Sequence, residues 1–209
     1  MRSARSGLGY SQQTIEPFPG WHDPKAKDQQ ILKEKQRSVS EWLVVRAQRG
    51  ERSAFEALIK LWHQRFYVYA MKRTQDREVA LDLTQEALVS ISRNLQKLSD
   101  PAGFPKWSFR ILERRYIDWQ RKVIRERQVM ALDEEAPEPA QLDNTDARID
   151  AKELLARLDP DIRVVLQLYY LDGMSLAEIA EILDVPTGTV KSRLYYARKL
   201  ANMTTSRPQ

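Results

Sequence analysis

The stretch that decides the fold is MSLAEIAEILDVPTGTVKSRLYYARKL, Met174 to Leu200. Ser175 followed three residues later by Glu178 is the capping-box pattern that begins a helix. Apolar residues then recur at i, i+3, i+4 and i+7, the spacing of one buried helical stripe: Leu176, Ile179, Ala180 and Leu183. Residues 184–186, Asp-Val-Pro, interrupt this helix because proline lacks an N–H and its predecessor avoids the helical conformation. The stretch therefore predicts a helix, a tight turn and a second helix.

The second helix of this pair has a basic outer face. We expect Thr187 to cap it and Val190, Leu194 and Ala197 to face inward. No acidic residue lies on the outer face, which is formed by Lys191, Ser192, Arg193, Tyr195, Tyr196, Arg198 and Lys199. Cations neutralise phosphates and long polar side chains reach base edges, so the pattern is typical of a DNA recognition helix. An ordinary helical hairpin with a solvated basic face is the alternative.

The composition of the 209 residues excludes several classes of protein. There is no cysteine, hence no disulfide, thiolate metal site or cysteine nucleophile, and the two histidines, His22 and His63, lie far apart. We expect no cofactor and no enzymatic activity. The sequence has neither an 18-residue apolar run nor an apolar signal core, which predicts a cytoplasmic protein. Scarce glycine and the absence of alternating strand patterns predict an all-α fold.

Composition divides the chain into four parts. Residues 1–38 are rich in Ser, Gln, Gly and Pro and are expected to be a flexible extension, with a helical lead-in over 25–37. Residues 39–127 carry helical periodicity, including a long helix that we expect Ser53 to cap. Residues 128–150 form an acidic, proline-containing linker. Residues 151–205 form a small domain of short helices that ends in the helix-turn-helix.

The segment Lys106 to Arg127 interleaves aromatic and basic side chains. Trp107, Phe109, Tyr116 and Trp119 alternate with eight basic residues, against three acidic ones. Bases stack on aromatic rings and phosphates pair with cations, so the pattern favours binding of single-stranded nucleic acid. Several of these rings also fall at core-like spacing, and packing is the alternative for each of them.

Four segments together resemble the extracytoplasmic-function (ECF) sigma factors of bacterial RNA polymerase, from about Ser40 to Ala201. RAQRGERSAFEALIKLW is similar to the family's opening helices, and DREVALDLTQEALVSISRNL to its polymerase-docking helix. FPKWSFRILERRYIDWQRK resembles the promoter-melting segment. LDPDIRVVLQLYYLDGMSLAEIAEILDVPTGTVKSRLYYARKL resembles the C-terminal domain, and this is the strongest match. The resemblance rests on the order of these four segments and on the linker between them.

The resemblance implies a protein that binds core RNA polymerase and directs promoter-specific initiation, with an anti-sigma factor as a further partner. It implies polymerase docking by Asp82, Leu83, Gln85 and Glu86. It implies recognition and melting of a single-stranded −10 element, with a base pocket at residues 99–105, by Phe104, Lys106, Trp107, Arg110, Arg114, Arg115 and Arg121. It implies contacts to a duplex −35 element by Thr187, Thr189, Lys191, Ser192, Arg193, Tyr195, Tyr196 and Arg198.

Three departures from the family pattern are visible. Arg114 replaces a frequent Asn, which affects the expected −10 base choice, and Asp184 replaces the usual Gly of the turn but tolerates its left-handed conformation. The first 38 residues have no clear family counterpart. One alternative function is a stand-alone helix-turn-helix regulator that binds an operator without polymerase. Another is an enzyme with Asp82 and Glu86 as metal ligands, for which no third ligand is in view.

Overall fold

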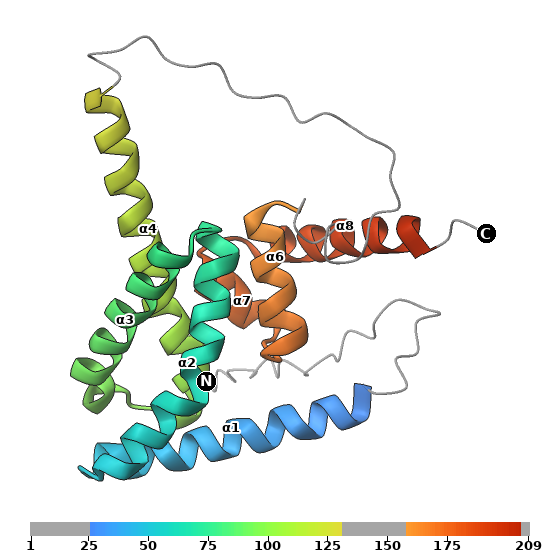
Figure 1. Ribbon diagram of the computed structural model, residues 1–209. Coiled ribbons are helices and arrows are strands. Elements are labelled where there is room, and N and C mark those ends of the chain that lie inside the picture. Colours follow the sequence, from blue (N-terminus) through green and yellow to red (C-terminus); the bar gives the residue numbers. More distant parts are fainter. Residues whose placement is uncertain (1–25, 131–157, 206–209) are drawn as a thin grey trace, which may run out of the picture.

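The computed structural model describes residues 26–130 and 158–205. All the secondary-structure elements in these two ranges are helices (Figure 1). The all-α prediction is confirmed for these residues, whereas residues 131–157, with most of the predicted linker, lie outside them. None of the described helices is long and apolar enough to cross a membrane. The α-helices are α1 (Ala26–Gln48), α2 (Arg52–Thr74), α3 (Arg77–Asn94), α4 (Phe104–Met130), α6 (Pro160–Leu166), α7 (Leu176–Leu183) and α8 (Thr187–Thr205).

Short local interactions set several helix ends. Asp76 caps α3 by accepting hydrogen bonds from the backbone N–H groups of Glu78 and Val79, at 2.8 and 3.1 Å. The prediction that Ser53 caps α2 is wrong, because α2 begins at Arg52 and its N-cap is Glu51. The Glu51 carboxylate is not available as a cap because it accepts from the Arg46 guanidinium, with Nε and Oε2 2.7 Å apart.

Helix α1 runs without interruption across residue 38, where the sequence suggested a boundary. It ends at Gln48, and Gly50 follows with a φ of +89°, a conformation that glycine adopts without strain. The helix is fixed to α2 through Ser40, which is fully buried and whose hydroxyl accepts a hydrogen bond from Trp62 Nε1 at 3.0 Å. The expected helical lead-in is therefore part of one long helix.

An aromatic cluster lies where α2 meets α4. Trp62 and Phe66 from α2 contact Phe104 and Phe109 from α4, with edge-to-face ring pairs 5.4 to 5.9 Å apart. All four side chains are at most 2% exposed. Burying four aromatic side chains in this geometry stabilises the packing of α2 against α4. Helix α3 packs on the same pair, and the C-terminal end of α4 projects away from the body (Figure 1).

The C-terminal helices pack directly on the N-terminal ones. Helix α6 lies against α2, and α7 lies against α4 (Figure 1). Val164, Leu168 and Ile179 are fully buried and belong to the same hydrophobic cluster as Leu58 and Phe66. Between α6 and α7 the chain forms a short π-helix, Gln167–Leu171. In this structure the N-terminal and C-terminal helices share one core.

Candidate nucleic-acid interface

The predicted helix-turn-helix is present with the expected local chemistry. At the start of α7, Ser175 Oγ accepts from the Glu178 N–H at 3.2 Å, and Glu178 Oε2 accepts from the Ser175 N–H at 2.8 Å. This is the predicted capping box. Helix α7 ends at Leu183, and its C-cap is Asp184, whose φ of 52° and ψ of 48° place it in the left-handed region. Aspartate tolerates this conformation better than most residues, so the turn forms without glycine.

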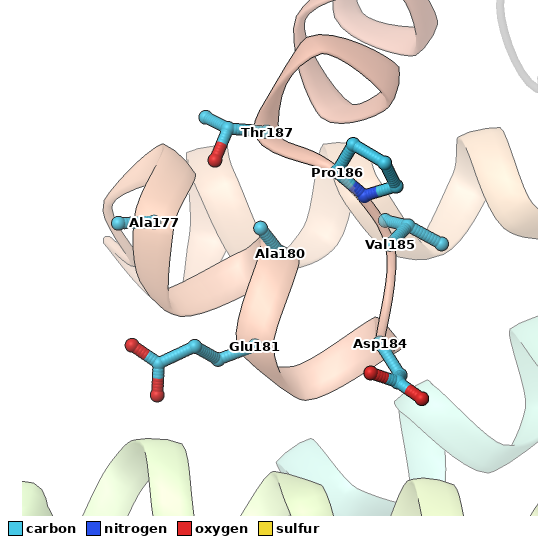
Figure 2. A pocket seen from close by; sticks show the side chains of 7 residues that line it. All are labelled: Ala177, Ala180, Glu181, Asp184, Val185, Pro186 and Thr187. Carbon is cyan, nitrogen blue, oxygen red and sulfur yellow. The ribbon is translucent and has the colours of Figure 1, made fainter.

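The second helix begins at Thr187, the residue that was predicted to cap it. Helix α8 starts at Thr187, so the position preceding the helix is Pro186, whose carbonyl accepts from the Thr189 N–H at 2.9 Å. Proline is suited to this place because it has no N–H to leave unpaired. Figure 2 shows a shallow hollow between α7 and the start of α8, with the small side chains of Ala177 and Ala180 among the residues that line it.

The outer face of α8 is exposed as predicted. Val190, Leu194 and Ala197 are at most 5% exposed and face inward. Polar and aromatic side chains cover the opposite face, with Tyr195 and Tyr196 at least half exposed. Exposed positions of the predicted −35 set are Thr187, Lys191, Ser192, Tyr195 and Tyr196, whereas Thr189 is half-buried. This face offers two exposed lysines, Lys191 and Lys199, together with hydroxyl groups and two aromatic rings.

Two arginines of the predicted −35 set have protein partners instead of facing solvent. Arg193 forms an ion pair with Asp161 of α6. Arg198 Nε donates to the Tyr170 hydroxyl at 2.7 Å, and its guanidinium lies over the Tyr169 and Tyr170 rings. In this structure both arginines hold α8 against the helices before it, so the basic residues on α8 do not form a single surface.

Helix α4 carries three of the predicted −10 residues on its exposed face. Arg110, Arg114 and Arg121 are exposed, and Arg110 and Arg114 lie one turn apart. Lys106 is half-buried and forms an ion pair with Glu181 of α7, with Nζ and Oε2 2.8 Å apart. A cation of α4 is therefore held by the helix-turn-helix itself.

The remaining predicted −10 residues are partly or fully inside the protein. Phe104 is fully buried in the aromatic cluster, so its side chain is a core residue in this structure and offers no surface to a base. Trp107 is half-buried, with its ring centroid 6.0 Å from that of Phe104. Arg115 Nη2 donates to Ser90 Oγ of α3 at 3.2 Å. Among the rings of residues 106–127, packing, the alternative considered for them, describes Phe109 fully and Trp107 in part.

The predicted polymerase-docking residues lie on one face of α3, with one exception. Asp82, Gln85 and Glu86 are exposed and follow the i, i+3, i+4 spacing of a single helix face. Leu83 is 3% exposed and belongs to the core. No group of three or more potential metal ligands occurs in the described ranges, 26–130 and 158–205.

A buried ionic network, to which the sequence analysis assigned no role, connects α2, α4 and α6. The Arg73 and Glu113 side chains are 4% and 5% exposed, and Arg73 Nε donates to Glu113 Oε2 at 3.0 Å. Tyr69 donates to the same carboxylate oxygen at 2.6 Å, and Arg73 also pairs with Asp161. Burial would lower the pKa of Arg73, but the electrostatic influence of Tyr69, Glu113 and Asp161 raises it. Arg73 therefore stays charged inside the protein.

One sequence signal could have revealed part of this network. Arg73 follows Tyr69 and Ala70 on the buried stripe of α2, and Glu113 follows Phe109 and lies beside Leu112 on the buried stripe of α4. A cation on one buried stripe and an acid on another indicate a buried pair, because a lone buried charge is costly.

Two parts of the chain match families of known domains. Residues 58–126 match Sigma-70 region 2, and residues 148–200 match Sigma-70, region 4. The RNA polymerase sigma factor SigV of Bacillus subtilis is 31% identical over 139 residues, which cover 66% of this chain and 82% of SigV. The ECF RNA polymerase sigma-E factor of Escherichia coli is 29% identical over 171 residues, 75% of this chain and 89% of that protein.

Two solved structures have a similar fold. One is the sigma factor RpoE in complex with the anti-sigma factor NepR from Bartonella quintana, with a TM-score of 0.55, 25% identity, and coverage of 74% of this chain and 98% of that one. The other is CnrH in complex with the cytosolic domain of CnrY, with a TM-score of 0.54, 22% identity, and coverage of 81% and 99%.

Proposed function

Since this chain belongs to the ECF sigma factors, which direct RNA polymerase to promoters, we propose that three exposed faces divide the work between them. The acidic face of α3, with Asp82 and Glu86, binds core polymerase. The basic face of α4 binds the −10 element, and the outer face of α8 binds the −35 element. The observation that supports this division is the exposure of all three faces on separate helices.

At the −35 element, α8 enters the major groove of duplex DNA. Lys191 neutralises a phosphate or donates to a base edge, while Tyr195 and Tyr196 offer hydroxyl groups and apolar ring surface. Each good base-edge contact discriminates against the wrong base by about 1–3 kcal/mol, and each neutralised phosphate adds about 0.9 to the log–log salt slope. Specificity thus comes from few residues and affinity from the cations.

At the −10 element, α4 holds the separated strand. Arg110 and Arg114, one turn apart, follow the phosphates, and the exposed part of Trp107 offers a ring edge to an unstacked base. Stacking on an aromatic side chain contributes about 1–3 kcal/mol per base, which offsets the few kcal/mol needed to unstack it. The loop at residues 99–105 remains the proposed base pocket, formed by its backbone and smaller side chains, since Phe104 faces the core.

The docking proposal is tested by charge reversal. Asp82→Lys combined with Glu86→Lys is expected to abolish co-purification with core polymerase, because the acidic face then repels a basic partner surface. Glu41→Lys combined with Glu56→Lys makes the same change in charge at exposed positions on α1 and α2 and should leave co-purification intact. Equal recovery of both double variants with core polymerase would reject docking through α3.

The −35 proposal is tested with the assembled holoenzyme on promoter duplex. Lys191→Ala and Arg198→Ala are expected to weaken −35 protection in footprinting and to reduce transcription from the promoter, whereas Lys60→Ala, an exposed lysine on α2, should not. The two substitutions should weaken binding for different reasons. Arg198 also donates a hydrogen bond to Tyr170, so its loss loosens the attachment of α8. Unchanged promoter use in both variants would contradict the assignment of α8.

A stand-alone regulator remains the alternative to exclude by experiment, and it would bind its operator duplex fully without polymerase. The matches to both region 2 and region 4 favour the sigma factor. We further propose an anti-sigma partner, because two proteins of similar fold are solved in complexes, one of them with an anti-sigma factor. Working with RNA polymerase implies a place in the cytoplasm at the nucleoid. Sigma factors are not themselves enzymes.

A further inference from the structure

The arrangement of the helices is incompatible with simultaneous contact to both promoter elements. The −35 and −10 elements are centred about 25 base pairs apart, roughly 85 Å at about 3.4 Å per base pair. In this structure Lys106 of α4 and Glu181 of α7 are 2.8 Å apart. Helix α8 has 19 residues, and at about 1.5 Å per residue it reaches only about 28 Å from the turn. The protein must open before it can occupy a promoter.

Among residues 26–130 and 158–205, four ion pairs hold the C-terminal helices against the N-terminal ones, and these four have the same polarity. The cation always comes from α1, α2 or α4 and the anion from the C-terminal part. Oppositely charged faces attract at long range and set the register of an interface. The pairs are Arg37–Glu178, Arg65–Asp172, Arg73–Asp161 and Lys106–Glu181.

The pair formed by Arg37 stands out because of where its partner lies. Arg37 Nη2 donates to Glu178 Oε1 and Oε2, each at 3.2 Å, and to the Gly173 carbonyl at 3.2 Å. Glu178 is the capping-box residue of α7, and Gly173 precedes the helix-turn-helix. A single guanidinium thus holds both the first turn of α7 and the chain leading into it.

The neighbouring residue on α1 supports the same connection. The side-chain oxygen of Gln36 accepts a hydrogen bond from Arg65, and Arg65 Nη1 pairs with Asp172 Oδ1 at 3.2 Å. Gln36 and Arg37 lie upstream of residues 58–126, the part that matches region 2. They therefore belong to the segment of the chain outside the matched family domains.

We propose that Gln36 and Arg37, on the upstream part of α1, form an intramolecular latch that holds the helix-turn-helix closed against α2 and α4 until polymerase or DNA separates them. This inference rests on the proposed function, because opening matters only to a protein that binds two distant DNA elements. In the closed form Glu181 forms an ion pair with Lys106, a cation of the proposed −10 surface. The latch thus keeps the free protein from binding promoter DNA.

The closed interface also contains a destabilising contact, so a modest latch can control it. Arg163 of α6 is 9% exposed, and its Nε and Nη2 have no hydrogen-bond partner in the structure. Burial lowers the pKa of Lys72 on α2, and the charge of Arg163 lowers it further while Asp172 opposes this. Unsatisfied buried charge is costly, and opening returns these groups to water.

The test measures the distance between the two halves of the protein in solution. The chain has no cysteine, so Ser92→Cys on α3 and Lys199→Cys on α8, both exposed positions, allow two spin labels and double electron–electron resonance. The wild-type sequence should give a short, closed distance. Arg37→Glu should raise the ratio of open to closed protein about fivefold or more, because it replaces attraction by repulsion. Arg37→Lys should retain part of the closed population.

The matched control is Arg52→Glu, which breaks an exposed ion pair with Glu56 within α2 and should leave the distance distribution unchanged. An unchanged distribution in Arg37→Glu, with helical content preserved by circular dichroism, would overturn the latch and leave the proposed function standing. Core polymerase added to the labelled wild type should lengthen the distance. A failure to bind core polymerase at all would instead count against the proposed function.

Discussion

Arg73 is a charged side chain held almost entirely out of water. Its neighbours Tyr69, Glu113 and Asp161 come from three helices, so the guanidinium joins the N-terminal core to the C-terminal part. A buried charge is tolerated only while all its partners are present. Removing one partner leaves an unpaired charge inside the protein, which destabilises the folded state. The network therefore makes the position of α6 sensitive to single substitutions in α2 or α4.

We predict that Glu113→Ala lowers the free energy of unfolding by about 3–5 kcal/mol, because Arg73 loses its main buried counter-ion. Urea denaturation followed by circular dichroism measures this as a lower midpoint with an unchanged slope. Arg52→Ala removes an exposed pair with Glu56 and should cost less than about 1 kcal/mol. A Glu113→Ala midpoint equal to that of Arg52→Ala would contradict the buried network.

Glu178 gives the closed form a dependence on pH. Its burial would raise its pKa, but hydrogen bonds from Ser175 and the charge of Arg37 lower the pKa overall. A carboxylate with a depressed folded pKa stabilises the protein above its unfolded pKa, about 4.3, and this stability is lost as pH falls through the folded value. We predict that the stability difference between wild type and Glu178→Gln is full at pH 7 and disappears on acidification towards pH 3, measured by denaturation across that range.

At the scale of elements, α8 has one side that we propose binds DNA and one side that anchors the helix to the protein. Lys191 is exposed, whereas Arg193, two residues later, pairs with Asp161. The sequence alone assigned both residues to DNA, because the helical spacing shows which side chains face the core and which face solvent. It does not reveal an ion pair with a helix about 30 residues away. The structure separates an exposed basic residue of α8, Lys191, from one that fixes where the helix lies, Arg193.

We predict opposite consequences for these two residues. Lys191→Ala should leave thermal stability unchanged and reduce the log–log salt slope of holoenzyme–promoter binding by about 0.9, the effect of one phosphate contact. Arg193→Ala should lower the free energy of unfolding by about 1–2 kcal/mol, because it removes hydrogen bonds between charged groups. Binding titrations at several salt concentrations and denaturation of both variants decide this, and identical behaviour of the two would refute it.

Local sequence chemistry predicted the elements well where the determining interactions are local. The capping box of Ser175 and Glu178, the turn at Asp184 and the inward face of α8 all depend on residues within one helical turn. The Ser53 cap failed because Glu51, not Ser53, immediately precedes the helix, and a propensity does not reveal where the first turn closes. The π-helix after α6 has no sequence period of its own, so the sequence does not distinguish it from a regular helix.

At the scale of the whole molecule, the packing of the C-terminal part on the N-terminal part was not predicted. Arg37 and Glu178 are 141 positions apart, and no periodicity in either segment indicates the other. The same holds for Phe104, which the resemblance placed at the DNA and the structure places in the core. The composition of a surface shows that it can bind a charged partner, but not that the partner is another part of the same chain.

Because one hydrophobic core joins both halves, their stabilities should be coupled. We predict that Phe66→Ala, a fully buried residue of α2, costs about 3–5 kcal/mol and also accelerates amide hydrogen exchange in α7 and α8. Ile124→Ala changes an exposed residue on the projecting end of α4 and should leave exchange in α7 and α8 unaltered. Native protection of α7 and α8 in Phe66→Ala would mean that the halves unfold independently.

The uniform polarity of the four ion pairs limits which C-terminal domains can be exchanged between related proteins. A transplanted recognition domain would bring its own promoter preference, but it would fit here only if acids stood at the positions of Asp161, Asp172, Glu178 and Glu181. Without these acids the chimera would lack the charge attraction that we propose helps to hold the closed form. Compatibility between the halves is therefore inherited separately from the choice of promoter.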